Sequence, residues 1–137
     1  MKYIVSLLII LILAVLRVDA QVVVIVHKSV NISTLNAAQI ADVFTLSTRV
    51  WPGGEKIIVF DQKGESVRKS FFDFIGRSPM DVRKKWLRSQ LSGEGKAPET
   101  LDSDDEVIQR VASTPGAIGY VSAGKAKGNV KVIATID

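Results

Sequence analysis

Apolar and polar residues alternate with two different periods along this chain, and the two periods predict strands and helices in turn. The run Gln21–Lys28 contains consecutive β-branched residues, which are typical of a strand buried on both faces of a parallel or mixed sheet. Lys56–Phe60 is a second short run rich in β-branched and aromatic residues, and it predicts another strand. Two further strands are predicted near the carboxyl end, at Ala117–Val121 and Val130–Ile136.

Four segments place apolar residues three or four positions apart behind a capping residue, and each predicts a helix. They span residues 36–44, 67–75, 78–91 and 103–111. In the first of them, Asn36 and Gln39 have the spacing of a capping box. The resulting order, β-α-β-α-α-α-β-β, predicts a single compact, three-layer-like α/β domain.

The third of these segments has an apolar and a basic side. The apolar residues that we expect to point inward are Val82, Trp86, Leu87 and Leu91. The basic residues expected to cover the outer side are Arg83, Lys84, Lys85 and Arg88.

The stretch Lys56–Gly76 predicts a strand, a polar turn and a helix in immediate succession. The turn is expected at Asp61–Ser66. A helix that starts directly after a strand points unpaired backbone N–H groups, and the positive end of its dipole, at whatever lies above the turn. Such a turn is a seat for a small anion, with the alternative that it holds only water.

The first twenty residues have the layout of a secretory signal peptide. Lys2 precedes an almost unbroken apolar run from Ile4 to Leu16, and cleavage is expected after Ala20. The run is shorter than the roughly 20 residues that a membrane span needs. An uncleaved anchor stays open as an alternative because Val22–Val26 is also apolar. We expect export to the periplasm or medium, with residues 21–137 as the domain and no stable membrane span after cleavage.

Composition narrows the classes of partner. The chain of 137 residues has a net charge of +4, and removal of Lys2, Arg17 and Asp19 with the leader lowers it to +3. This mild excess suits acidic ligands or a membrane surface but falls far short of a dedicated nucleic-acid binder. There are no cysteines and one histidine, His27. We therefore expect no disulfide, no lipoprotein modification, no metal cluster and no cofactor.

Signals for catalysis are weak. The chain lacks a Gly-x-Ser-x-Gly elbow, and only His27 could act as a histidine base. The acids Asp104, Asp105 and Glu106 are explained by capping of the last predicted helix. We expect a protein that is not an enzyme.

Several segments, in matching order and spacing, carry a family resemblance: residues 35–44, 51–54, 64–71, Trp86, 92–98 and, most specifically, 114–121. Together they resemble the substrate-binding proteins of phosphate ABC transporters, which are periplasmic binding proteins of type 2. The similarity spans nearly all of residues 21–137. It implies the fold of one lobe of such a protein and a non-catalytic role related to phosphate transport.

Two departures from the family pattern affect the site that the resemblance implies. Family members clamp the anion between two lobes, and this chain resembles only the second lobe. The family's anion turn runs Arg, any residue, Asp or Glu, Gly, Ser, Gly, Thr, and the matching positions here run from Asp61 to Val67. Only Gly64 is retained. The arginine that would grip phosphate has become Asp61, and the threonine has become Val67.

The groups that remain to hold a phosphate-like oxyanion are Lys63, Gly64, Ser66 and Arg68. Asp61 and Glu65 are expected to oppose it, because two like charges about 4 Å apart repel by ~1 kcal/mol in bulk water and by more in a shielded cleft. Glu65 could also fill the helix start itself, in place of a ligand.

Two functions stay open at this point. The first is an exported binding domain that holds a small oxyanion weakly, alone or as a self-associated pair. The second is an interaction module of the cell envelope that has lost anion binding. It would dock another protein through the basic Arg83–Arg88 face or through Ser92–Thr100, which is expected to be a mobile loop.

Overall fold

The computed structural model describes residues 21–137, so the predicted leader and its cleavage site lie outside the described residues. The elements in chain order are β1 (Val22–Val26), α2 (Ala37–Phe44), β2 (Ile58–Gln62), α3 (Glu65–Ile75), α4 (Pro79–Leu91), β3 (Glu99–Leu101), α5 (Asp104–Ser113), β4 (Ala117–Ser122), the 3-10 turn η2 (Ala123–Lys125) and β5 (Lys131–Ile136). Every predicted strand and helix is present, and β3 is additional.

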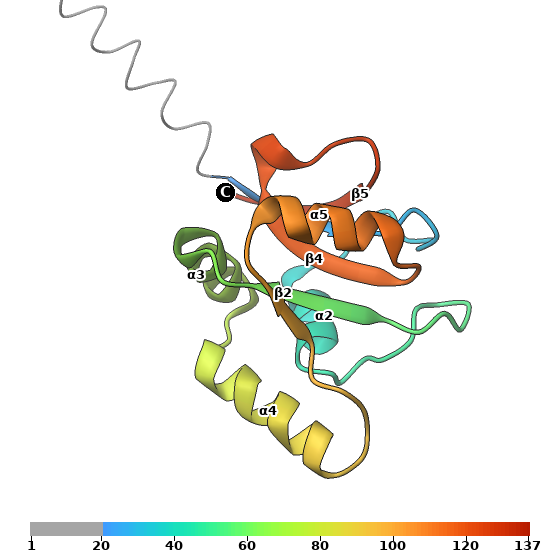
Figure 1. Cartoon of the computed structure of the whole chain (residues 1–137), viewed down its shortest axis with the longest axis vertical. Coiled ribbons are helices and arrows are strands. Elements are labelled where there is room, and N and C mark those ends of the chain that lie inside the picture. Colours follow the sequence, from blue (N-terminus) through green and yellow to red (C-terminus); the bar gives the residue numbers. More distant parts are fainter. Residues whose placement is uncertain (1–20) are drawn as a thin grey trace, which may run out of the picture.

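The strands form one mixed sheet in the order β3-β2-β4-β1-β5 (Figure 1). β2 runs parallel to β3 and β4, whereas β1 runs antiparallel to β4 and β5. All five residues of β1 are buried. The prediction that this strand is covered on both faces of a mixed sheet is therefore confirmed.

Two clusters of buried side chains lie on opposite faces of the sheet, and alternate residues of β1 belong to each. Val22, Val24 and Val26 belong to one cluster with buried side chains of α2, α3 and α4. Val23 and Ile25 pack on the other face with side chains of α5. Figure 1 shows this order of layers, with α5 in front of β4 and α2 behind the sheet. The three-layer α/β prediction is confirmed.

Local capping agrees with the sequence pattern. Asn36 Oδ1 accepts the Gln39 N–H at 2.8 Å, and the Gln39 side chain accepts the Asn36 N–H at 2.9 Å, which completes the predicted capping box. Ser78 and Ser103 cap α4 and α5. Gly76 ends α3 with a φ of 66°, the left-handed conformation that favours glycine.

Two predicted boundaries are wrong. Asp61 and Gln62 belong to β2 and are buried, so the turn between β2 and α3 contains only Lys63 and Gly64. Glu99 and Thr100 were expected in a mobile loop, but they form β3 with Leu101 and pair with Phe60, Asp61 and Gln62. In both cases the sheet extends a strand through polar residues, because pairing with a neighbouring strand satisfies their backbone groups.

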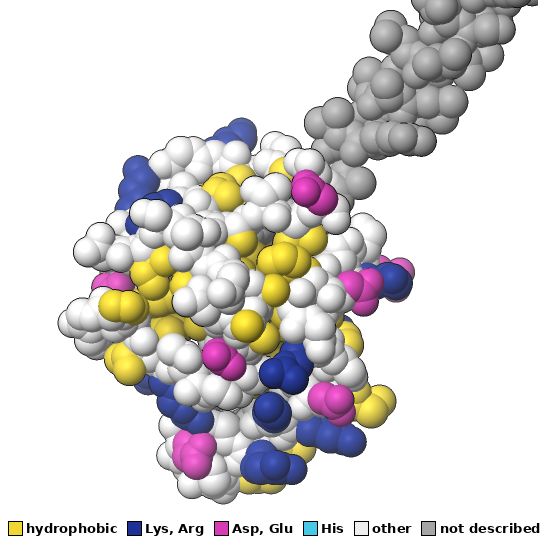
Figure 2. Space-filling model, turned by 180° about the vertical axis from the view of Figure 1, so that it is seen from behind, with side chains coloured by type: hydrophobic (Ala, Val, Ile, Leu, Met, Phe, Trp, Pro, Cys, Tyr) yellow, Lys and Arg dark blue, Asp and Glu magenta, His cyan; other side chains and the backbone are white. Residues whose placement is uncertain are grey.

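The inward face of α4 is also narrower than predicted. Val82 and Trp86 are buried as expected, and Trp86 Nε1 donates to the Phe44 carbonyl oxygen at 2.6 Å. Leu87 and Leu91, however, are 55% and 79% exposed. Only one edge of α4 reaches the domain, and in Figure 1 this helix stands apart at the lower end of the molecule. Seen from behind, Lys and Arg side chains gather around that end (Figure 2).

Glycines allow the close packing around β4. A Cβ at Gly119 would lie 2.7 Å from Val107 of α5, and a Cβ at Gly116 would lie 2.2 Å from the Lys56 carbonyl oxygen. Trp51, 4% exposed, donates from Nε1 to the Gly116 carbonyl at 2.9 Å. The Trp51 ring is thus part of the core. Within residues 21–137, the helices are too short or too polar to cross a membrane.

Candidate oxyanion site at the start of α3

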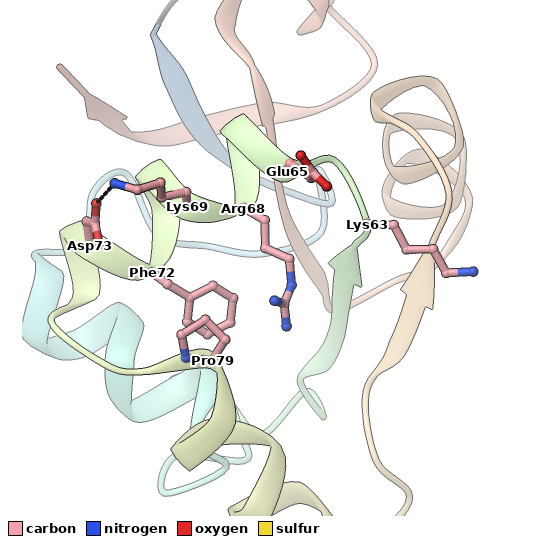
Figure 3. Close-up of a pocket in the computed structure, with 7 residues that line it drawn as sticks. All are labelled: Lys63, Glu65, Arg68, Lys69, Phe72, Asp73 and Pro79. Atoms are coloured by element: carbon pink, nitrogen blue, oxygen red, sulfur yellow. Dashed lines mark hydrogen bonds and ion pairs between the residues drawn. The ribbon is translucent and has the colours of Figure 1, made fainter.

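The carboxyl ends of the parallel strands β2, β3 and β4 lie at one edge of the sheet, and α3 and α5 both begin there. In open α/β sheets this edge is where ligands usually bind. The four residues expected to hold an anion, Lys63, Gly64, Ser66 and Arg68, all fall on the turn after β2 or the first turn of α3. Figure 3 shows their surroundings.

Gly64 is the N-cap of α3, and no side chain caps this helix. The first intrahelical bond runs from the Arg68 N–H to the Gly64 carbonyl at 2.9 Å, so the N–H groups of residues 65–67 precede the helical ladder. A Cβ at Gly64 would approach Gln62 Oε1 to 2.7 Å. Ser66 is exposed in this first turn. The helix start is therefore open, with a hydroxyl beside it.

Arg68 lies beside the seat but is already paired. Its Nη2 and Nε lie 3.3 Å and 3.4 Å from Asp61 Oδ2, and its guanidinium lies over the Phe72 ring, 4.8 Å from the centroid. The Asp61 side chain is 1% exposed and that of Arg68 21% exposed. A largely desolvated pair of this kind holds the cation firmly, because removing either partner leaves a buried charge.

Tyr120 is the second partner of Asp61. Its hydroxyl donates to Asp61 Oδ1, and its ring stacks on Phe71 with centroids 4.0 Å apart. Burial, reinforced by the negative charge of Asp61, raises the pKa of Tyr120 well above its ordinary value of 10. The phenol therefore stays protonated and remains a hydrogen-bond donor to the carboxylate.

Lys63 does not reach the seat. Its ammonium pairs with Asp102 Oδ1 at 3.1 Å, and both side chains are mostly exposed. Figure 3 shows the side chain extending away from Arg68 and Phe72. Exposed pairs of this kind contribute at most about 1 kcal/mol, so Lys63 can leave Asp102 for another anion at low cost.

The two acids expected to crowd the seat are separated in the structure. Asp61 is buried within β2 and faces Arg68, whereas Glu65 is exposed and its carboxylate points away from Arg68 (Figure 3). Glu65 forms no cap on α3. The prediction that Glu65 occupies the helix start in place of a ligand is therefore wrong. Instead, Asp61 occupies the Arg68 guanidinium, which a ligand would otherwise bind.

A surface depression of about 300 Å³ lies beside this network. It is lined by Lys63, Glu65, Arg68, Lys69, Phe72, Asp73 and Pro79. Its charge is mixed, and Lys69 pairs with Asp73 at 3.1 Å. The depression is wide enough for a small oxyanion, but its cations are partly neutralised by its own acids.

Three residues that shape this edge were not singled out from the sequence as site residues: Gln62, Asp104 and Tyr120. Gln62 Nε2 donates to Asp104 Oδ1 at 2.9 Å and to the Tyr120 carbonyl at 2.7 Å. Asp104 also accepts the Ser122 N–H at 3.3 Å. The sequence signal for this network was Gln62 at the end of an apolar strand. A glutamine buried there needs hydrogen-bond partners from neighbouring segments.

The chain's histidine lies elsewhere, at the end of β1. His27 Nδ1 accepts the Ser29 N–H at 2.9 Å, while Ser29 Oγ donates to Glu55 Oε1 at 2.9 Å. The acid therefore contacts the serine and not the histidine, which is the wrong order for a nucleophilic triad. Among residues 21–137, no group of three or more His, Asp or Glu side chains is placed to hold a metal ion.

Comparison with known proteins shows which solved structures share this fold. A scan of family models and a search of curated proteins both find no match. Among solved structures, a protein described as a phosphate ABC transporter substrate-binding protein, from Clostridium perfringens and with bound phosphate, matches with a TM-score of 0.69 at 21% identity. An ABC-type phosphate transport receptor from Vibrio cholerae matches at 0.64 and 17%, and PstS from Borrelia burgdorferi at 0.63 and 18%.

These matches cover 83–84% of this chain but only 45–47% of the other chains. The chain thus spans less than half the length of the structures it matches, and a single lobe of their architecture accounts for it. The resemblance inferred from the sequence is confirmed at the level of the fold.

Proposed function

We propose that this chain is an exported, non-catalytic domain of the solute-binding type, related to phosphate transport, that binds phosphate or a similar oxyanion weakly. The open start of α3 at Gly64 is the observation that carries the proposal, because uncapped N–H groups at a helix start favour an anion. The shared fold with phosphate-binding proteins supports it. Ser66 and Lys63 would supply a hydroxyl and a mobile ammonium.

Asp61 sets the strength of this binding. It holds Arg68, the one cation of the site that is largely shielded from water, and so competes with any ligand for the guanidinium. A single lobe also leaves one side of the anion in water, where each contact is weaker. We therefore expect affinity in the millimolar range, improved if a second copy or an envelope protein covers the site.

Calorimetric titration with inorganic phosphate at low salt tests the proposal. Saturable binding is expected for the unaltered chain and is lost in Ser66→Ala and Lys63→Ala. Asp61→Asn should tighten it, because the amide no longer neutralises Arg68. Lys96→Ala, an exposed cation outside the depression, is the matched control. Absence of heat in both the unaltered chain and Asp61→Asn would contradict the proposal.

A second candidate is favoured by the pairing of Arg68 with Asp61 and of Lys63 with Asp102. With both cations engaged, the lobe would serve as an interaction module of the cell envelope whose anion seat is no longer used. The candidate docking surfaces are the Arg83–Arg88 face of α4 and the segment 92–98 before β3. The phosphate titration separates this candidate from the first.

A further inference from the structure

α4 carries a second apolar stripe on the side that faces away from the core. Met80, Leu87 and Leu91 are 68%, 55% and 79% exposed. They are spaced seven and four residues apart, so they lie in one row along the helix. Val82 and Trp86, which attach α4 to the domain, lie on the opposite side. α4 is thus apolar on two faces, and only one of them is covered.

Cations border the exposed stripe. Lys84 falls between Met80 and Leu87 on the same face, and Arg83 and Arg88 lie on its two sides by helical position. All three are exposed, and among the described residues none of them forms an ion pair. The acid of α4, Asp81, lies in its first turn, where it complements the helix dipole. The stripe therefore favours an anionic partner.

The shape of the surface decides which anionic partner fits. Figure 1 shows α4 as a helix standing apart from the sheet, and Figure 2 shows basic side chains around that end of the molecule. Three side chains on a convex ridge fall short of the roughly 800 Å² that each partner contributes to a stable protein interface. Pairing with α4 of a second copy would bring the unpaired cations of both helices together, which is unfavourable.

We infer that α4 docks this domain on an anionic lipid surface. Met80, Leu87 and Leu91 enter the interface, while Arg83, Lys84 and Arg88 extend their apolar stems along the stripe and place their charges among lipid phosphates. A membrane accepts a convex ridge without a matching groove. Each basic residue near such a surface strengthens binding, and the effect declines as salt is added.

The cysteine-free sequence permits a direct test in the full chain. A polarity-sensitive fluorophore is attached to Leu87→Cys, and the matched control carries it on Gly128→Cys. Gly128 is exposed in the segment between η2 and β5, which Figure 1 shows at the end of the molecule away from α4. A Cβ added there would have no other atom within 4 Å. We expect a blue shift of the label at residue 87, but not at 128, on adding phosphatidylcholine vesicles that contain phosphatidylglycerol.

Two substitution sets separate specific docking from general charge attraction. In the chain labelled at residue 87, neutralising Arg83, Lys84 and Arg88 to Gln should weaken vesicle binding about 100-fold at low salt. Neutralising Lys96, Lys125 and Lys127, three exposed cations elsewhere, should weaken it far less. Free inorganic phosphate should compete no better than chloride of equal ionic strength, which distinguishes lipid docking on α4 from oxyanion binding at α3.

Three results would overturn the inference. The first is no shift at residue 87 with anionic vesicles, and the second is an equal shift with neutral vesicles. The third is a dimer seen by sedimentation and lost in Leu91→Gln, without any vesicle response, which would assign the stripe to protein contact. None of these results bears on the phosphate titration, so the two proposals can fail separately.

Discussion

α3 and α4 are consecutive helices whose basic side chains differ in how they are paired. At α3, Arg68 is held by the buried Asp61, and Lys69 pairs with Asp73 one turn further along the helix. At α4, the basic residues form no ion pair among those described, and they border an exposed apolar stripe. Within the helices themselves, α3 has two cations and two acids, whereas α4 has four cations and one acid. The partner that holds Arg68 comes from outside α3, from β2. The difference lies in whether the fold supplies its own anion.

The largest expected effect concerns Asp61, the buried carboxylate of β2 that pairs with Arg68 of α3. Asp61→Ala removes the ion partner of Arg68 and the acceptor of the buried Tyr120 hydroxyl, and should lower the free energy of unfolding by about 3 kcal/mol. Urea denaturation measures this. The matched control is Asp73→Ala, which breaks an exposed pair and should cost less than about 0.5 kcal/mol. Equal losses in the two variants would show that Asp61 is no more important than a surface acid.

An intermediate effect tests the two faces of α4. Val82→Ala deletes buried methyl groups and should destabilise the chain by about 2 kcal/mol. Leu87→Ala removes a larger side chain from an exposed position, and its effect should stay within about 0.5 kcal/mol. Denaturation midpoints of the two variants provide the measurement. A greater loss of stability for Leu87→Ala than for Val82→Ala would show that Leu87 points inward, as the sequence pattern predicted.

The smallest effect concerns pH. Because the folded-state pKa of Tyr120 is raised, the folded chain keeps its phenolic proton while the unfolded chain loses it above pH 10. Stability should therefore be fully present below pH 10 and fall above it by about 1.4 kcal/mol per pH unit. Urea denaturation on both sides of pH 10, compared with Tyr120→Phe, isolates this residue from the lysines. An identical pH slope in the two proteins would contradict the assignment.

The sequence predicted the elements well where a local signal was complete. Backbone groups at three helix ends are satisfied by residues only a few positions away. These ends are the capping box at Asn36 and Gln39, the start of α4 at Ser78–Pro79 and the glycine end of α3. Consecutive β-branched residues likewise gave β1. These signals act over a few residues, so they do not depend on contacts with distant parts of the chain.

Prediction from the sequence failed where a residue's pairing or packing partners come from distant segments of the chain. β3 contains Glu99 and Thr100, which have no strand pattern of their own and are strands because β2 offers its edge. Leu87 and Leu91 fit a helical apolar period, but the domain provides no surface for them to contact. Asp61 was expected in a turn facing a ligand, and Tyr120, fifty-nine positions later, makes it a core residue.

By itself the sequence determined the fold class, the order of the helices and the polar turn that opens α3, because capping, periodicity and turn chemistry act over a few residues. Only the tertiary structure decided which charges are free. It buried Asp61 between Arg68 and Tyr120. Among residues 21–137, it gave the basic side chains of α4 no ion-pair partner. Neutralisation of a charge depends on which side chains the sheet and helices bring together, and that pairing is long-range.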